Sequence, residues 1–490
     1  MTKPMHPTRR VVRAASLLAL LGAVALAACD QDKLLTVQTP DVVLPADIAS
    51  RAALPSAFAA AVGDFQLAYA GGYGAQLPLL DYNEGFAQMT ALLTDEMLNA
   101  ETYNTRIEVD RRATTIINST TLQTFQVAQQ ARATADLVAG RYRELDPTNP
   151  QRAEAQTLAA FMYVMFAEGY CNGVPTSRVL PDGTFEYGPP QSGTQLLLTA
   201  VAKFDSAITV AVAAGTAGST ALNLARIGKG RALLDLGNFA EAAAAVAAVP
   251  SGFLYEIQHS ETTGRQNNAF FAFNYLESRF SVSEKEGING LPFVSLDDSR
   301  APVFEAVAML GGNYEFGFDG STPLFFTTKY FDYKSPTPLA TGAEARLIEA
   351  EAALRVGDAG TFLAKLNEAR ASAPTYPSEP DQTSLPRPQP AALTAAQIPA
   401  SPAARIDLLF RERALTLFLT GHRVGDLRRL TYQYARPTES VWPTGAYQDD
   451  NPDKQGTNYG PDVNLPIPQE ESNNPQFPGG QCINRSADIK

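Results

Sequence analysis

The sequence predicts a mostly α-helical protein, built as a scaffold of helical hairpins with an inserted subdomain rich in loops and aromatic residues. Long segments lack proline and lack glycine until near their ends, as helices require; they are residues 122–145, 153–170 and 195–213. Two hairpin-like segments repeat each other at a fixed offset. Between them, residues 253–333 hold 17 Phe or Tyr in 81 positions, whereas the whole chain is 9% aromatic.

The composition excludes several classes of protein. With 490 residues, 45% hydrophobic and 18% charged, the chain is neither disordered, collagen-like nor a polytopic membrane protein. Lys and Arg number 39 against 51 Asp and Glu, a net charge of −12. We therefore expect no nucleic-acid partner, because an acidic chain binds a phosphate backbone poorly.

Residues 1–28 are expected to be a lipoprotein signal peptide that is removed. Four basic residues between positions 3 and 13 precede an uncharged apolar run of 15 residues, 14–28, too short to span a bilayer. Small residues lead into Cys29, as in the bacterial lipobox, where the thiol is acylated and the chain is cut before it. An ordinary signal peptide with an incidental cysteine is the alternative. Arg9-Arg10 leaves open whether export uses the Sec or the twin-arginine route.

The mature chain would be anchored to a membrane by lipid rather than spanning it. Removing the signal leaves 35 basic and 51 acidic residues, a net charge of −16. Residues 29–50 carry Pro40 and Pro45 without periodicity and are expected to form a lipidated tether. Residues 51–490 are expected to form one domain, with 250–340 as its loop-rich insertion.

Two cysteines remain after lipidation of Cys29. In an oxidising compartment, Cys171 and Cys482 are expected to form a disulfide. The alternative is a pair of free buried thiols.

A weak internal repeat indicates paired helices. Ala225-Arg226-Ile227 recurs as Ala345-Arg346-Leu347, an offset of 120. Further matches at this offset are Gly230 with Ala350, Gly237 with Gly357, and Asn238 with Asp358. The small residues Gly230 and Ala350 allow two helices to pack closely. The glycines allow a left-handed turn at the end of the first helix. Asn238 and Asp358 can cap the helix that follows. Each unit resembles a tetratricopeptide (TPR-like) repeat; a generic helical hairpin is the alternative.

No sequence motif indicates catalysis. The sequence has no Gly-x-Ser-x-Gly, P-loop, His-Glu-x-x-His or zinc-spaced cysteine motif, and only His259 and His422 lie beyond the predicted signal. Asp449, Asn451 and Asp453 alternate as in a calcium loop, but the glycine and the closing glutamate are missing. We expect no catalytic residues, no metal and no cofactor, and therefore not an enzyme.

Motifs spread along the chain resemble the SusD/RagB family of nutrient-uptake outer-membrane lipoproteins. They are Thr94–Glu96, Glu344–Ala352, Leu366–Arg370, Arg411–Arg413, Gly421–Arg423, Asp426–Arg429 and Leu465–Pro468. The chain departs from the family at Thr416, where a Glu is common, and in having Trp442 as its only tryptophan. From the residues themselves, the arginines near 411–429 are expected to pair with Glu412 and Asp426 and pin a helix to the loop after it.

The resemblance implies a function in uptake. A SusD-like protein is a surface-exposed, lipid-anchored lid of a SusC-like TonB-dependent outer-membrane β-barrel, and it captures oligosaccharide or peptide nutrients without chemistry. The expected location is the outer membrane, facing the cell surface. Two alternatives remain: a tetratricopeptide-type assembly scaffold lipoprotein of the outer membrane, and a lipidated hydrolase.

In the family, ligand contacts come from loops after the Thr-Asp-Glu segment and from the insertion. The matching residues here are Tyr103, Asn104, Arg106 and Asp110 on one side, and Tyr314, Phe316 and Phe318 on the other. The three rings alternate in sequence, so an extended segment would put them on one face. They either form a stacking platform for glycan binding, flanked by the polar 103–110 loop, or pack into the insertion's own core.

Overall fold

The computed structural model describes residues 48–74, 82–180, 184–307, 314–377, 379, 385–448, 454 and 456–477. The chain divides into two units, residues 1–43 and 44–490, and all of the described residues belong to the second. The predicted signal peptide, Cys29 and most of the tether lie outside the described residues, as do Asp449, Asn451 and Asp453. Cys171 is buried and disulfide-bonded. Cys482 also lies outside the described residues, so its pairing with Cys171 stays a prediction.

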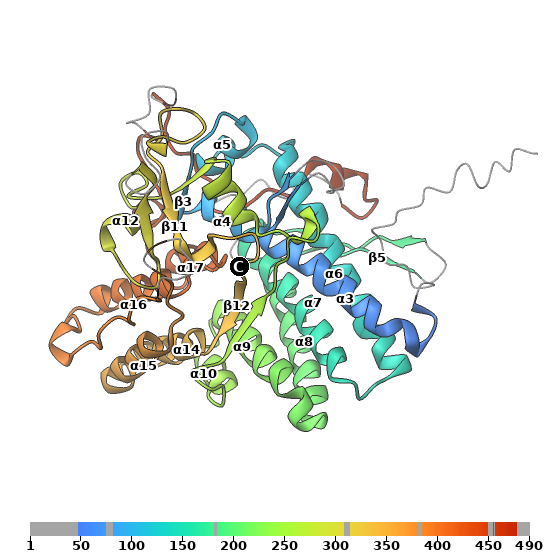
Figure 1. The fold of residues 1–490 in the computed structure, drawn as a ribbon. Helices are drawn as coiled ribbons and strands as arrows, with labels where there is room; N and C mark the ends of the chain where they lie inside the picture. The colour runs from blue at the N-terminus through green and yellow to red at the C-terminus, as the bar shows by residue number, and fades with distance from the viewer. Residues whose placement is uncertain are drawn as a thin grey trace, which may run out of the picture. The chain divides into compact units, whose positions relative to one another are not determined.

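Long helices form the scaffold (Figure 1). They are α3 (Leu54–Ala70), α6 (Ser119–Leu145), α7 (Pro150–Gly169), α8 (Gly193–Ala213), α9 (Ser219–Asp235), α10 (Phe239–Val246), α14 (Gly342–Arg355), α15 (Ala359–Ser372), α16 (Pro402–Thr416) and α17 (Arg423–Tyr432). From α6 to α10 each helix packs against the next in the chain. The predicted mostly helical fold is confirmed.

Side-chain caps explain where several of these helices begin. Asn118 accepts hydrogen bonds from the backbone of Thr120 and Thr121 at the start of α6. Asn149 caps α7, whose first residue is Pro150, a position where proline costs no hydrogen bond. Ser192 and Gln195 form a capping box on α8. α8 is long and apolar enough to cross a membrane by composition, but it packs between α7 and α9 as a helix of the scaffold.

The two repeat units are the hairpins α9–α10 and α14–α15. Gly237 and Gly357 both have left-handed backbones, with φ of 79° and 78°, as the repeat predicts. A Cβ on Gly230 would lie 2.4 Å from Val246 Cγ1, so a small residue is needed there. Asp358 caps α15 through Thr361, whereas Asn238 makes no side-chain cap on α10, so that part of the prediction is wrong. The hairpins are far apart in sequence but adjacent in space, because α10 packs against α14.

Between α10 and α14 the chain forms short elements around an aromatic core. They are β8 (Leu254–Ile257), α11 (Ala269–Phe271), the π-helical turn η5 (Ala272–Leu276), β9 (Phe280–Val282), α12 (Phe293–Leu296), β10 (Val303–Glu305), β11 (Phe325–Thr327), η7 (Thr328–Tyr330) and β12 (Thr337–Thr341). Strands pair antiparallel as β10–β11 and β12–β8, while β9 pairs with β3 (Met97–Asn99) of the N-terminal half. Phe270, Phe273, Phe280, Phe326 and Tyr330 are fully buried. Much of the aromatic enrichment therefore forms the core of this region.

The remaining elements are short. The helices are α4 (Phe86–Leu93) and α5 (Asn104–Asp110), with 3-10 turns η2 (Arg51–Ala53), η3 (Gly215–Gly218), η4 (Gly264–Gln266), η8 (Ala395–Gln397), η9 (Thr438–Ser440) and η10 (Gln469–Asn473). The strands are β1 (Gly72–Tyr73), β2 (Tyr82–Asn83), β4 (Val174–Pro175), β5 (Arg178–Val179), β6 (Phe185–Glu186) and β7 (Pro190–Gln191). They form the antiparallel pairs β1–β2, β4–β7 and β5–β6.

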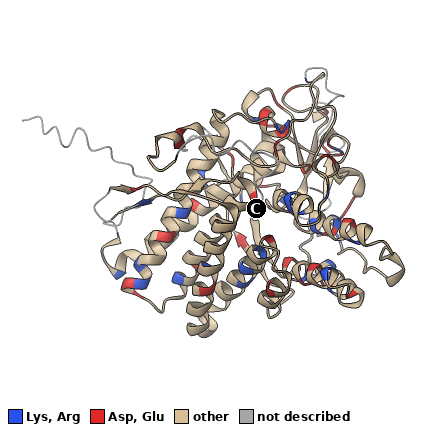
Figure 2. Cartoon of the chain, turned by 180° about the vertical axis from the view of Figure 1, so that it is seen from behind, with Lys and Arg blue, Asp and Glu red and all other residues tan. Residues whose placement is uncertain are grey.

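The C-terminal arginines hold the scaffold together through buried ion pairs. Arg413 Nε donates to both carboxylate oxygens of Asp426 at 2.9 and 2.8 Å, as predicted, but this pair joins α16 to helix α17 and not to a loop. Glu412 pairs with Arg300 and Arg370 instead of the arginines near it in sequence, so that part of the prediction is wrong. Arg429 also reaches Asp426, at 2.8 Å. Arg423 forms a two-pronged pair with Asp95 at 2.6 and 2.7 Å, joining α17 to the N-terminal half. Elsewhere, acidic and basic positions are interspersed along the helices (Figure 2).

Candidate ligand-binding platform

Three segments that are distant in sequence meet beside the β3–β9 pair. The backbone N–H of Ala100 donates to Arg279 O at 2.8 Å, and Ala100 O accepts from the N–H of Asp319 at 3.0 Å. The N–H of Phe318 donates to Ser278 O at 2.8 Å. Gly317 permits this approach, since a Cβ there would lie 2.4 Å from the Cβ of Ala100. The β3–β9 pairing and these backbone hydrogen bonds thus bring the 100–106, 277–279 and 314–320 segments together.

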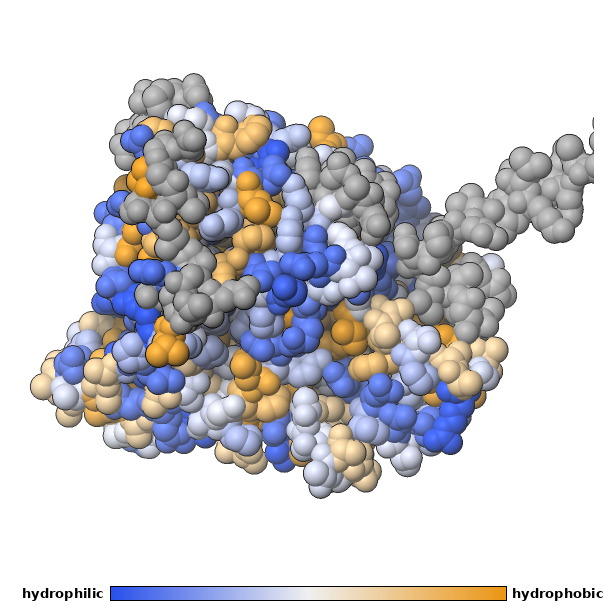
Figure 3. Space-filling model, viewed as in Figure 1, coloured by the Kyte–Doolittle hydropathy of each residue, from blue (hydrophilic) through white to orange (hydrophobic). Residues whose placement is uncertain are grey.

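The side chains of Tyr103, Arg279 and Phe318 form what we call the aromatic platform. The Arg279 guanidinium carbon lies 4.3 Å from the Phe318 ring centroid and 5.3 Å from that of Tyr103. Tyr103 is 47% exposed and Phe318 is 55% exposed, so both rings face solvent. On the face of the molecule shown in Figure 3, apolar residues form small separate patches among polar ones.

Carboxylates on two sides fix Arg279 between the rings. Its Nη1 donates to Glu101 at 2.6 Å, and its Nη2 donates to Glu277 at 3.1 Å. Burial alone would lower the pKa of Arg279, but these carboxylates raise it, so the guanidinium stays charged. The Tyr73 hydroxyl donates to the other oxygen of Glu277. Burial and this bond raise the pKa of Tyr73, which keeps the hydroxyl a donor.

Two residues predicted to contact ligand lie inside the protein, and that prediction is corrected. Arg106 is 1% exposed and pairs with Glu84 and, at 2.5 Å, with Glu101. Its guanidinium carbon lies 5.4 Å from the Tyr103 ring centroid, so it supports the platform from beneath. Asp110 is fully buried and accepts a hydrogen bond from the N–H of Asn99 at 2.9 Å. A buried charge is stable only when paired or hydrogen-bonded, and both residues meet that need internally.

The other five predicted residues lie at the surface. Asn104 is exposed at the start of α5 and donates to Glu108 at 2.9 Å. Tyr314 and Phe316 are exposed, so with Phe318 they do not pack into the insertion's core. Arg279 and Glu277 were missed by the sequence interpretation. These two residues have opposite charges and lie two positions apart in a stretch rich in aromatic residues, and this pattern could have indicated that they belong to the site.

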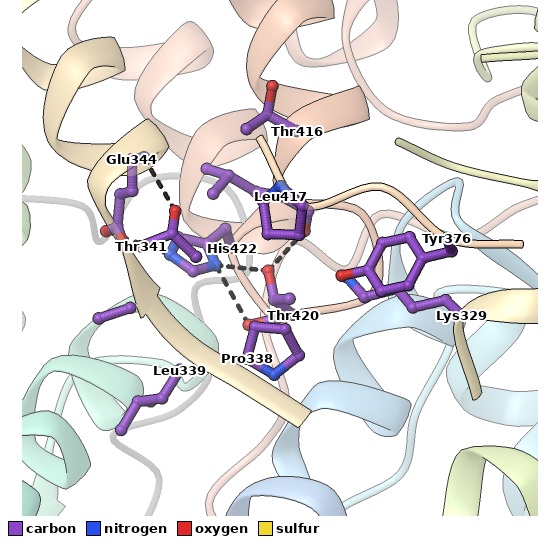
Figure 4. Close-up of a pocket in the computed structure, with 12 residues that line it drawn as sticks. Lys329, Pro338, Leu339, Thr341, Glu344, Tyr376, Thr416, Leu417, Thr420 and His422 are labelled. Carbon is purple, nitrogen blue, oxygen red and sulfur yellow. Dashed lines mark hydrogen bonds and ion pairs between the residues drawn. The ribbon is translucent and has the colours of Figure 1, made fainter. Parts of the chain in front are cut away.

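A second candidate is a small cavity lined by residues from β12, η7 and the turn after α16 (Figure 4). It has room for about one water molecule. Its polar groups bond one another: Thr420 Oγ1 lies 2.8 Å from His422 Nδ1, and the Lys329 ammonium donates to Phe418 O. Burial lowers the pKa of Lys329 to about 7. The cavity is too small for a sugar or peptide, and its residues brace the 417–422 turn.

A buried carboxyl pair does not support the hydrolase alternative. Glu168 and Asp235 line another cavity of about one water's size, and both are buried. Burial, and then the Asp235 carboxylate, raises the pKa of Glu168. Glycosidases place two accessible carboxyl groups about 5 Å or more apart across the scissile bond. Glu168 and Asp235 instead face each other inside the scaffold. Within the described residues, no group of three His, Cys, Asp or Glu is placed to hold a metal.

Comparison with known proteins identifies the family. Residues 335–477 match the SusD family. Solved structures of this family match nearly the whole chain. The chain therefore contains a segment that matches the SusD family, and it has the fold of the solved SusD-like structures. The family predicted from its motifs is thereby confirmed, while no functionally curated protein matches the sequence.

Three solved structures illustrate the similarity of the fold. A SusD-like carbohydrate-binding protein from Bacteroides fragilis has a TM-score of 0.59 at 15% identity, covering 88% of this chain and 99% of the other. A laminarin-binding SusD-like protein has a TM-score of 0.57 at 16% identity, covering 88% and 99%. A SusD superfamily protein from Bacteroides thetaiotaomicron has a TM-score of 0.59 at 14% identity, covering 86% and 98%. At these identities the likeness shows a shared fold.

The segment that carries the family match is separate from the platform. Residues 335–477 include Arg413, Asp426 and Arg429 of the buried ion pairs. Tyr103, Arg279 and Phe318 all precede that segment. The most recognisable motifs therefore belong to the scaffold, as the sequence indicated.

Proposed function

We propose that this SusD-family protein captures oligosaccharides on the aromatic platform, without chemistry. The observation that carries the proposal is the pair of exposed rings, Tyr103 and Phe318, held by Arg279 between them. Aromatic faces stack on the apolar C–H faces of sugar rings. Proteins of the same fold that bind carbohydrate or laminarin support this choice of ligand class.

The surroundings of the rings suit a sugar better than an apolar peptide. A sugar alternates C–H faces with hydroxyl groups, so its site needs rings and hydrogen-bonding groups together. The exposed Asn104 amide and the partly exposed Glu277 carboxylate provide such groups beside the rings. Because the rings are already held in place by Arg279, binding would cost little ordering of the protein.

We further propose that the mature protein is lipid-anchored through Cys29 at the outer membrane and acts as the lid of a SusC-like TonB-dependent β-barrel. The lipobox and the family support this location and partner. The test is affinity purification of the native lipoprotein from detergent-solubilised membranes. A stoichiometric β-barrel of the TonB-dependent class is expected; its repeated absence, with the lipoprotein intact, would overturn the partnership.

The binding proposal is tested with Phe318→Ala, assayed by affinity electrophoresis against a panel of neutral polysaccharides that includes laminarin. Affinity should fall about fivefold, since losing one stacked ring removes roughly 1 kcal/mol. The melting temperature should change little, because Phe318 is more than half exposed. Tyr103→Ala should behave in the same way.

Phe326→Ala is the matched control. Phe326 is a fully buried ring of β11, and its loss should cost roughly 3–5 kcal/mol of stability. Its surviving folded fraction should bind glycan normally. If Phe318→Ala melts early or binds as well as the wild type, the platform is not the glycan site.

A further inference from the structure

We propose that the aromatic platform selects uncharged oligosaccharides and rejects anionic ones that carry carboxylate or sulfate groups. The inference rests on the proposed glycan binding and adds the charge class of the ligand. It comes from the arrangement of charges in and beneath the platform.

The two arginines of this region are outnumbered by the carboxylates bound to them. Arg106 is paired with Glu84 and Glu101, and Arg279 is paired with Glu101 and Glu277. Two positive and three negative charges give this cluster a net charge of −1. The two terminal nitrogens of the Arg279 guanidinium already donate to Glu101 and Glu277. A ligand carboxylate could therefore bind Arg279 only by displacing one of these two carboxylates.

One of the three carboxylates, that of Glu277, lies nearer to solvent than either arginine. The Glu277 side chain is 29% exposed, whereas that of Arg279 is 11% exposed and that of Arg106 is 2% exposed. Glu315 is exposed within the segment that carries Phe318. The nearby cation Lys454 is buried and lies 3.0 Å from an Asp319 carboxylate oxygen. A sugar stacked on the rings therefore meets carboxylates rather than an available cation among the described residues.

These charges give a quantitative expectation. Like charges a few ångströms apart at a protein surface repel enough to weaken binding about tenfold, so a ligand carboxylate brought next to Glu277 should bind about tenfold more weakly than an uncharged group. Salt screens such exposed charges, so the effect should shrink as ionic strength rises. Neutral sugars feel no such repulsion and can use Glu277 as a hydrogen-bond acceptor.

The test compares laminarin with carboxymethyl-laminarin, and dextran with carboxymethyl-dextran, by affinity electrophoresis and calorimetry at low and high salt. At least one neutral parent should bind at least about tenfold more tightly than its carboxymethyl form at low salt, with the gap narrowing at high salt. Equal binding, or tighter binding of the anionic form, would overturn the charge selection while leaving glycan capture intact. Binding of no member of either pair would overturn the proposed capture itself.

The variant Glu277→Gln isolates the residue responsible. Glutamine can still accept the Tyr73 hydrogen bond, while the cluster becomes neutral and one prong of Arg279 loses its anion. The ratio of the affinities for neutral and carboxymethyl glycan, measured on the same variant, should narrow several-fold. Glu241→Gln, which removes the same charge from α10, well separated from α5 in Figure 1, should leave the discrimination intact. If both variants change the discrimination between neutral and carboxymethyl glycan equally, this discrimination comes from the net charge of the protein and not from the platform.

Discussion

Replacing Glu344 by glutamine should destabilise the protein in a way that depends on pH. Glu344 lies in the first turn of α14, and its carboxylate is 1% exposed. It accepts hydrogen bonds from Arg231 Nε at 2.8 Å and Nη2 at 2.9 Å, which join α14 to α9. His422 Nε2 lies 3.2 Å away. The variant would leave the buried Arg231 charge without its anion.

The magnitude follows from the electrostatics of this carboxylate. Burial alone would raise the pKa of Glu344, but Arg231 and His422 outweigh it and hold the pKa at about 2, against 4.5 for a free glutamate. A carboxyl lowered by that amount contributes roughly 3 kcal/mol at neutral pH. This value agrees with the loss of about 3–5 kcal/mol of stability that follows when one partner of a buried ion pair is removed. Because the folded pKa is depressed, this stability is present above pH 4.5 and is lost as pH falls toward 2.

The assay is urea unfolding of the full mature chain, followed by circular dichroism at pH 7, 5, 4 and 3. The free energy of unfolding of the wild type should exceed that of Glu344→Gln by roughly 3 kcal/mol at pH 7. This difference should shrink steadily below pH 4.5. Glu368→Gln is the control, because its side chain is 42% exposed and its ion pairs should contribute less than about 1 kcal/mol. A difference that is absent at pH 7, or constant across the series, would refute the reasoning.

Three other expectations can be checked directly. Cys29→Ala should give a soluble or unprocessed protein in membrane fractionation and protease shaving of whole cells; a variant still firmly bound to the membrane contradicts lipidation. A non-reducing peptide map should show Cys171 linked to Cys482, and two alkylatable thiols in the unreduced denatured protein would exclude that bridge. Burial raises the pKa of Glu96 to about 8, despite the N–H that Leu419 donates to it at 2.7 Å, so its stabilising contribution is lost as pH rises through 8. The melting temperature of Glu96→Gln should therefore fall less than that of the wild type between pH 6 and 9, and parallel curves would contradict this.

Local signals in the sequence predicted the helical scaffold well. Helices of twenty or so residues leave a clear pattern, and α7, begun by Pro150, was placed within a few residues of its bounds. The turns at Gly237 and Gly357 were predicted because left-handed backbone strongly favours glycine. The contact between α10 and α14 was beyond prediction, since it depends on how the intervening residues fold back.

The candidate site was predicted only in its exposed aromatic part. Polar residues beside a ligand loop were expected to face outward, but Arg106 turns inward because Glu84 and Glu101 offer it partners. Arg279 was missed because its place beside Tyr103 is set by the pairing of β3 with β9, strands of three residues each. Strands that short carry no recognisable period, and the pairing joins positions roughly 180 residues apart.

The separation of the platform from the segment that carries the family match has an evolutionary consequence. Residues 335–477 hold buried arginine–carboxylate pairs, where a single change removes a partner from a buried charge and is strongly destabilising. Tyr103 and Phe318 lie outside that segment and face solvent, so changing them should alter stability by about 0.5 kcal/mol or less. Selection can therefore exchange the rings freely while it preserves the scaffold. Proteins of this fold can then differ in the residues of the platform and still be recognised as relatives, by residues that lie away from it.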